Sequence, residues 1–122
     1  MFSKTPNEIT RLKSKKSIEV LFSEGVHIRK KPFKLICEAN QSGVLALGFG
    51  VSKRLFPKAV DRNRIKRLMR EQFKLLRVKE DYRLFYGSGF FVYEGKKMPT
   101  LNDMEHPMQD LISSWRSVAE AP

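Results

Sequence analysis

The most regular hydrophobic pattern in the chain lies between Lys58 and Arg77 and predicts a helix. At 100° per residue, its core-facing positions recur at the i, i+3, i+4, i+7 spacing of a helix that packs one side on a core. These positions are Ile65, Leu68, Met69, Gln72, Phe73 and Leu76. The opposite side carries Arg62, Asn63, Lys66, Arg67, Arg70, Lys74 and Arg77. We therefore expect this helix, with one buried and one basic face, to be the central element of the fold.

Two shorter helices are predicted on either side of it. The first covers 15–24, between a serine that can cap its start and a glycine that ends it. The last begins at a cap formed by Asn102 or Asp103 and runs to about Val118, with apolar residues at helical spacing.

Strands are predicted where β-favouring side chains gather, at 33–39, 44–52 and 90–93. Turn residues at 40–43 predict that the first two strands form an antiparallel hairpin. The segment 80–87 is ambiguous between loop and strand, 27–32 is interpreted as a basic connector, and 1–13 as an arm leading into the fold. The resulting order of elements predicts an α+β fold, a single compact domain over 1–122 with about four strands and three helices.

Length, cysteine content and apolar runs are those of an ordinary single domain. A chain of 122 residues with 41% hydrophobic content can bury one core and is too short for two ordinary domains. The single Cys37 excludes an intramolecular disulfide and fits a reducing compartment, where we expect it to be a core residue. No signal peptide is visible, and the longest apolar run is far too short to span a bilayer. We expect a soluble, cytoplasmic protein without a membrane partner.

The charge is large and unevenly distributed. The formal net charge is +11, and residues 1–77 hold 19 of the 24 basic side chains but only 6 of the 13 acidic ones. In the central helix, like charges stand four residues apart at Arg62, Lys66, Arg70 and Lys74. Solvated charged helix faces usually alternate acids with bases at this spacing, so the pattern favours a nucleic-acid surface.

The sequence contains no complete nucleotide-binding or metal-ligand motif. The Gly48-x-Gly50 segment begins like a dinucleotide-binding loop but has Lys53 where the third glycine belongs, and it is interpreted as a strand. His27 and His106 have no cysteine or paired carboxylate at metal-ligand spacing. We therefore expect no catalytic residues, no metal site on the protein and no small-molecule substrate.

Most aromatic side chains are expected in the core. They are Phe22, Phe33, Phe49, Phe73, Phe90, Phe91 and Trp115. The exception would be any ring in an open cleft beside the basic residues, where RNA bases can stack.

Two segments, Gly50 to Lys53 and Lys58 to Glu71, resemble the bacterial ribonuclease P protein subunit. The specific pattern is Ala-Val, then Arg-Asn-Arg, one spacer, Lys-Arg, two spacers and Arg-Glu. The likeness extends upstream as far as the Arg11-Leu12-Lys13 segment and fades after about Tyr82.

The resemblance implies a fold like the second domain of ribosomal protein S5 and an accessory role in an endoribonuclease. In the family, the RNA subunit cuts the 5′ leader from precursor tRNA using Mg²⁺, and the protein supports that RNA and grips the leader. The implied partners are the ribonuclease P RNA subunit and precursor tRNA, and the implied cofactor, Mg²⁺, is used by the RNA and not bound by a protein motif.

Residue by residue, the resemblance implies two sites. The family's motif helix, which lies against the catalytic RNA near the cleavage site, matches Arg62, Asn63, Arg64, Lys66, Arg67 and Arg70. Together with Lys53, Arg54, Lys58 and Lys74, these form the predicted RNA-binding set. The family's leader cleft maps onto Ile18, Phe22, Lys34 and Ile36. The family commonly has aromatics where Ile18 and Ile36 stand, so stacking is expected to fall on Phe22.

Three other functions were weighed. A ribosomal or other structured-RNA-binding protein without a processing role would use the same electrostatics. A DNA-binding protein could place the basic helix in the major groove, but no dimerising heptads accompany that helix. A stand-alone nuclease is disfavoured by the missing carboxylate or histidine cluster.

Overall fold

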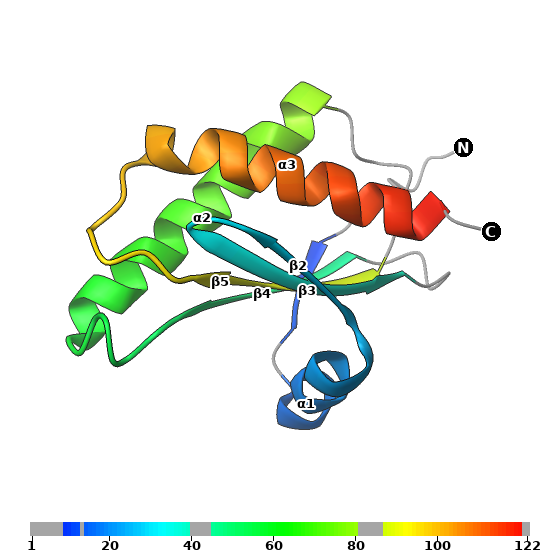
Figure 1. Cartoon of the computed structure of the whole chain (residues 1–122), viewed down its shortest axis with the longest axis horizontal. Helices are drawn as coiled ribbons and strands as arrows, with labels where there is room; N and C mark the ends of the chain where they lie inside the picture. The colour runs from blue at the N-terminus through cyan, green and yellow to red at the C-terminus, as the bar shows by residue number, and fades with distance from the viewer. Residues whose placement is uncertain (1–8, 13, 40–44, 81–86, 121–122) are drawn as a thin grey trace.

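The computed structural model describes residues 9–12, 14–39, 45–80 and 87–120. Along the chain they form β1 (Ile9–Arg11), α1 (Lys15–Glu24), β2 (Val26–Lys30), β3 (Phe33–Ala39), β4 (Leu45–Val51), α2 (Ala59–Glu80), β5 (Gly87–Tyr93) and α3 (Leu101–Glu120). The strands form one sheet in the order β1-β4-β5-β3-β2. Helices α2 and α3 cover one face of this sheet, and α1 lies against the other (Figure 1). The predicted α+β class with three helices is confirmed.

The sheet has five strands where about four were expected. β2 lies in the segment interpreted as a basic connector, and β1 lies within the predicted arm. Both are outer strands, and of the five residues of β2 only Ile28 is even partly buried. β1 is only three residues long, and the apolar–polar alternation of β2 covers only Val26 to Arg29 before two lysines follow. Neither segment is therefore recognised as a strand from its pattern alone.

The predicted hairpin between β3 and β4 is wrong. β5 lies between them, antiparallel to β3 and parallel to β4. Helix α2 carries the chain from the end of β4 back to its start, so β5 can run beside β4 in the same direction. The hairpin partner of β3 is β2, which pairs with it antiparallel from Val26↔Cys37 to Lys30↔Phe33.

Capping residues in the sequence predicted the ends of the helices more accurately than side-chain patterns predicted the strands. At the start of α1, the Ser14 hydroxyl accepts a hydrogen bond from Ser17 N at 3.3 Å, as a capping residue should. The cap of α3 is Thr100 and not Asn102 or Asp103. Thr100 Oγ1 accepts from Asp103 N at 3.1 Å, while Asp103 Oδ2 accepts from Thr100 N at 2.9 Å. This reciprocal pair satisfies two backbone donors of the first turn.

β5 begins earlier than predicted, at Gly87 rather than Phe90. Gly87 and Gly89 precede the predicted strand but are part of the observed one, and Gly89 has a packing role. A Cβ on Gly89 would lie 2.5 Å from the Trp115 ring, so the missing side chain lets that ring rest on the strand. The ambiguous segment before Gly87 falls at 81–86, outside the described residues.

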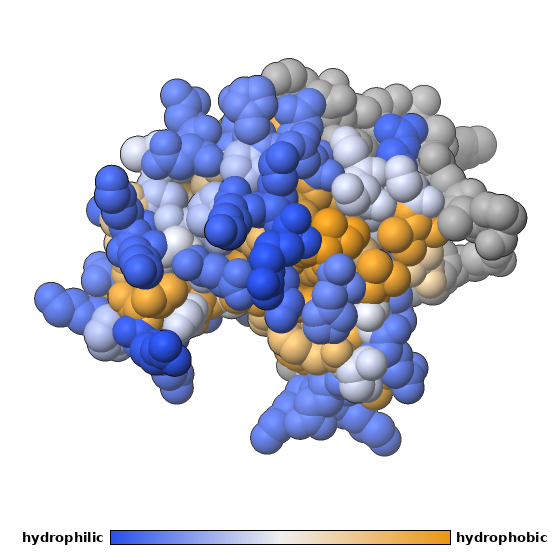
Figure 2. All heavy atoms as spheres, in the orientation of Figure 1, coloured by the Kyte–Doolittle hydropathy of each residue, from blue (hydrophilic) through white to orange (hydrophobic). Residues whose placement is uncertain are grey.

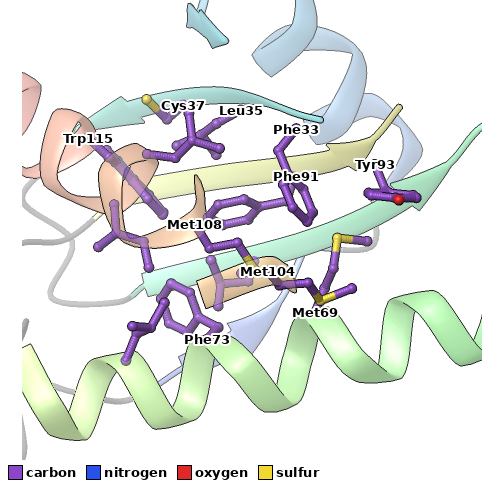
Figure 3. Close-up of a cluster of buried hydrophobic side chains, with 14 of the residues drawn as sticks. Phe33, Leu35, Cys37, Met69, Phe73, Phe91, Tyr93, Met104, Met108 and Trp115 are labelled. Carbon is purple, nitrogen blue, oxygen red and sulfur yellow. The ribbon is translucent and has the colours of Figure 1, made fainter. Parts of the chain in front are cut away.

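The main core lies between the sheet and the two helices α2 and α3 (Figure 3). Strand residues such as Phe33, Leu35 and Phe91 meet helix residues such as Met69 and Trp115 there, all at most 1% exposed. Cys37 is buried in this core as expected. Burial, with a smaller contribution from the charge of Glu38, raises its pKa to about 12, so the thiol is unreactive at neutral pH.

Helix α2 buries the side that its sequence pattern predicted. Ile65, Met69, Phe73 and Leu76 are at most 1% exposed. Gln72 is buried with them, and its Nε2 donates to the Leu101 carbonyl at 2.7 Å, which ties α2 to the start of α3. No helix within the described ranges is long and apolar enough to cross a membrane.

Candidate nucleic-acid interface

The packing of α2 turns its basic side away from the core. Asn63, Arg64, Arg67, Arg70 and Lys74 are exposed, and Lys66 is half-buried. Because the opposite side of the helix is locked between the sheet and α3, these side chains have a fixed common direction. The structure thus brings the predicted basic residues of the helix together on one surface.

Arg62 behaves differently from its neighbours on the helix. Its Nη1 donates to the carbonyl oxygens of Phe56 and Pro57, at 2.9 and 2.7 Å. These bonds fasten the loop between β4 and α2 to the first turn of the helix. A guanidinium has five N–H donors, so the other nitrogens of Arg62 can still meet a phosphate, but the side chain is also a structural clamp.

The loop that Arg62 fastens carries the remaining predicted RNA-binding cations. Lys53, Arg54 and Lys58 are exposed there, just before α2. Within the loop, Phe56 N donates to Ser52 O at 3.0 Å, which closes a turn around Lys53 and Arg54.

A groove of about 530 Å³ runs beside the basic side of α2. Lys66, Arg70 and Lys74 form its cationic wall, and Arg11 of β1 adds a fourth positive charge. Phe49 of β4 and Phe90 of β5 also line it. The lining is completed by Thr10, Leu12, Ile18, Leu47, Gly48 and Phe73. Such a combination of cations and aromatic rings suits a single-stranded nucleic acid, which offers phosphates and base faces together.

The two aromatic rings of the groove are half-buried and held in place. The Arg70 guanidinium carbon lies 5.6 Å from the centre of the Phe49 ring, a cation–π contact. Phe90 lies edge-on to Phe22 of α1, with 5.3 Å between ring centres. A Cβ on Gly48 or Gly50 would lie 2.5 or 2.8 Å from the Phe90 ring, so the ring rests on bare backbone.

The four residues mapped to the leader cleft are not equally available. Ile18 is half-buried and lines both the groove and a shallow hollow of about 450 Å³ that Phe22 also lines. Phe22 is 37% exposed and Lys34 is half-buried. Ile36, by contrast, is 0% exposed and offers no surface to a ligand.

The sequence did not identify Phe90 as a site residue. Its ring lines the groove, whereas the side chain of Ile36 is fully buried. Phe90 pairs with Ile36 across β3 and β5, so both point to the α1 side of the sheet. The spacing Gly48-x-Gly50 was the available signal, because two glycines on one face of a strand leave room for a large neighbour. Only the strand register shows that the neighbour is Phe90.

Within the described residues, no three or more His, Cys, Asp or Glu side chains gather where they could hold a metal ion. The groove brings together cations, aromatic rings and aliphatic side chains, a combination that can bind a polyanion.

Comparison with known proteins gives a consistent family. A family model described as Ribonuclease P matches residues 7–113. Among curated proteins, the ribonuclease P protein component of Legionella pneumophila (strain Lens) is 39% identical over 64 residues, which are 52% of this chain and 56% of the relative. That of Nitrosococcus oceani is 35% identical over 66 residues, 54% of this chain and 56% of the relative. The matched stretch thus spans little more than half the length of these relatives.

Solved structures agree in fold. The RNase P protein of Staphylococcus aureus superposes with a TM-score of 0.69 at 22% identity, covering 90% of this chain and 97% of that one. A mutant of the same protein, described as defective in mRNA degradation activity, gives a TM-score of 0.72 at 22% identity, covering 87% of each chain. At this identity the likeness concerns the fold.

Proposed function

Because this chain belongs to the Ribonuclease P family, we propose that it acts as the protein component of ribonuclease P and binds the RNA subunit and the 5′ leader of precursor tRNA. The observation that carries the proposal is the groove that Lys66, Arg70 and Lys74 line together with Phe49 and Phe90. A leader is a single strand, and it offers phosphates to the cations and bases to the rings.

Residues on the basic side of α2 contact two different RNA molecules, the RNA subunit and the leader of the substrate. The outward residues Asn63, Arg64 and Arg67 are exposed and meet phosphates of the structured RNA subunit. The groove side carries Lys66, Arg70 and Lys74 and leads to Phe90 and Phe22, where the leader lies. Helix α2 then holds the RNA subunit and the substrate next to each other.

The protein assists the reaction without performing it. In this proposal the RNA subunit and its phosphates hold the Mg²⁺ ion, whose preferred ligands are oxygen atoms. Neutralising phosphates with a high density of fixed cations reduces the repulsion between RNA subunit and leader. The protein should therefore matter most when Mg²⁺ is scarce.

Reconstitution tests this function. The RNA subunit is incubated with precursor tRNA at low Mg²⁺, with and without the protein, and the protein is also tested alone. We expect the protein to raise cleavage by the RNA and to cleave nothing by itself. Cleavage by the protein alone would refute the division of labour. Tight binding of the RNA subunit without any gain in cleavage would favour a structural RNA-binding protein instead.

A further inference from the structure

One end of the sheet gathers three connections that are far apart in the sequence. A row of paired residues crosses four strands there, since Val51 pairs with Tyr93, Tyr93 with Phe33, and Phe33 with Lys30. Adjacent strands are about 4.8 Å apart, so the row spans roughly 15 Å. The connections that leave it are 31–32, 52–58 and 94–100. The two longer ones lie at the left end of Figure 1.

The three connections are fastened to one another. Glu94 N donates to the Pro32 carbonyl at 2.8 Å, which joins the β5–α3 connection to the β2–β3 turn. The Tyr93 hydroxyl donates to the Lys97 carbonyl at 2.8 Å, and the Tyr93 ring lies 6.1 Å from the ring of Phe56 in the β4–α2 loop. Their side chains are therefore presented from one connected framework.

Each connection carries exposed cations, six in all: Lys31, Lys53, Arg54, Lys58, Lys96 and Lys97. None of the six forms an ion pair with another residue that the structure describes. The one acid in these connections, Glu94, lies 3.7 Å from Arg29 and is thereby balanced. Hydrophilic side chains project from this end of the molecule in Figure 2. We call these six residues the loop-end surface.

Three of the six cations, Lys31, Lys96 and Lys97, were not expected in any site. Lys31 lies in the segment interpreted as a basic connector. Lys96 and Lys97 belong to residues 78–122, where acids outnumber bases, and nothing in the helix pattern points to them. The fold nevertheless places them on the same end as Lys53, Arg54 and Lys58, which lead directly into α2. The loop-end surface is thus continuous with the basic side of the helix.

We infer that the loop-end surface is a second phosphate-binding surface, on which Lys31, Lys96 and Lys97 contact the backbone of the RNA that α2 binds. The inference rests on the proposed function. A run of cations without acidic partners among the described residues attracts a polyanion, and the RNA already held by α2 is the polyanion nearest to it.

The test compares two lysine pairs in the full chain. Lys96→Ala with Lys97→Ala removes two charges from the loop-end surface. Lys15→Ala with Lys16→Ala removes two charges that are also exposed, from α1, as a matched control. Binding to the ribonuclease P RNA subunit is measured at several salt concentrations. If each lysine neutralises one phosphate, the first pair should lower the slope of log affinity against log salt by roughly 1.4 to 1.8.

Further variants and controls complete the test. Lys96→Arg with Lys97→Arg should restore the slope, and the thermal midpoint of the Lys96/Lys97 and Lys15/Lys16 variants should stay unchanged. An unaltered slope in the Lys96/Lys97 variant, or an equal loss in the Lys15/Lys16 control, would overturn the inference. Lys66→Ala with Arg70→Ala is run beside them. If that pair loses slope and the Lys96/Lys97 pair does not, only the loop-end surface is refuted, whereas no loss in either refutes the proposed function too.

Discussion

The two faces of the sheet differ sharply in how they are covered. The face under α2 and α3 holds nearly all the fully buried side chains, including Phe91, Met104 and Trp115. The face under α1 is covered by one short helix, and there Phe22 and Phe90 remain partly exposed. Burial on the first face provides most of the free energy that stabilises the domain. The second keeps aromatic surface available at little cost to that stability, which is what a binding surface requires.

Adjacent residues of β5 give the strongest test of this contrast. Phe91 lies in the core against Phe73 and Trp115, and Phe90 lies on the α1 side. Phe91→Ala should destabilise the protein by about 3 to 5 kcal/mol, because it leaves a cavity in a closed core. Phe90→Ala should cost clearly less stability and instead weaken binding of precursor tRNA. Chemical denaturation of both variants measures the difference, and equal losses would mean that the two faces are one core.

The next test concerns the bare backbone under Phe90. In Gly48→Ala, the new methyl group would meet the Phe90 ring at 2.5 Å. The ring must move, so we expect a loss of about 1 to 3 kcal/mol in unfolding free energy together with weaker leader binding. In the double variant with Phe90→Ala, the methyl group has room and the stability cost of Gly48→Ala should disappear. A cost that persists in the double variant would show that the glycine acts through the backbone.

Phe22 sharpens the comparison at a smaller magnitude. Stacking of one base on an aromatic ring is worth about 1 to 3 kcal/mol. Phe22→Leu should therefore lose part of this affinity for precursor tRNA with a leader of several nucleotides, while binding of mature tRNA and the thermal midpoint stay nearly unchanged. Both affinities and a melting curve are needed. An equal loss on the two tRNAs would remove Phe22 from the leader site.

The smallest expected effect separates two cations of α2. Lys66 lines the groove, whereas Arg62 also holds the Phe56 and Pro57 carbonyls. Lys66→Ala should lower the salt slope of RNA binding by about 0.7 to 0.9 without a change in stability. Arg62→Ala should in addition lose about 1 kcal/mol of stability, from its hydrogen bonds to the loop. Identical melting curves for the two variants would contradict the structural role of Arg62.

The sequence predicted what depends on local spacing. The buried and basic sides of α2, the Ser14 cap and the burial of Cys37 all follow from residues a few positions apart. Strand pairing does not, because β5 enters between β3 and β4 from far along the chain. For the same reason the groove was only partly predicted. Its basic wall follows from the residue spacing within α2. The contact of the Phe90 ring with Gly48 and Gly50 depends on the register between β4 and β5.

The central position of β5 also has a consequence for the order of folding. Its Tyr93 pairs with Phe33 and Val51, so β3, already beside β2, and β4, already beside β1, each lack their second neighbour until residues 87–93 have been synthesised. A nascent chain that has just completed α2 therefore presents two apolar strand edges and a basic helix without the rest of its core. Unpaired edges of this kind favour association between chains, and such distant pairings slow folding. During synthesis the domain should thus be vulnerable for the time that it takes the ribosome to pass from β4 to the end of β5.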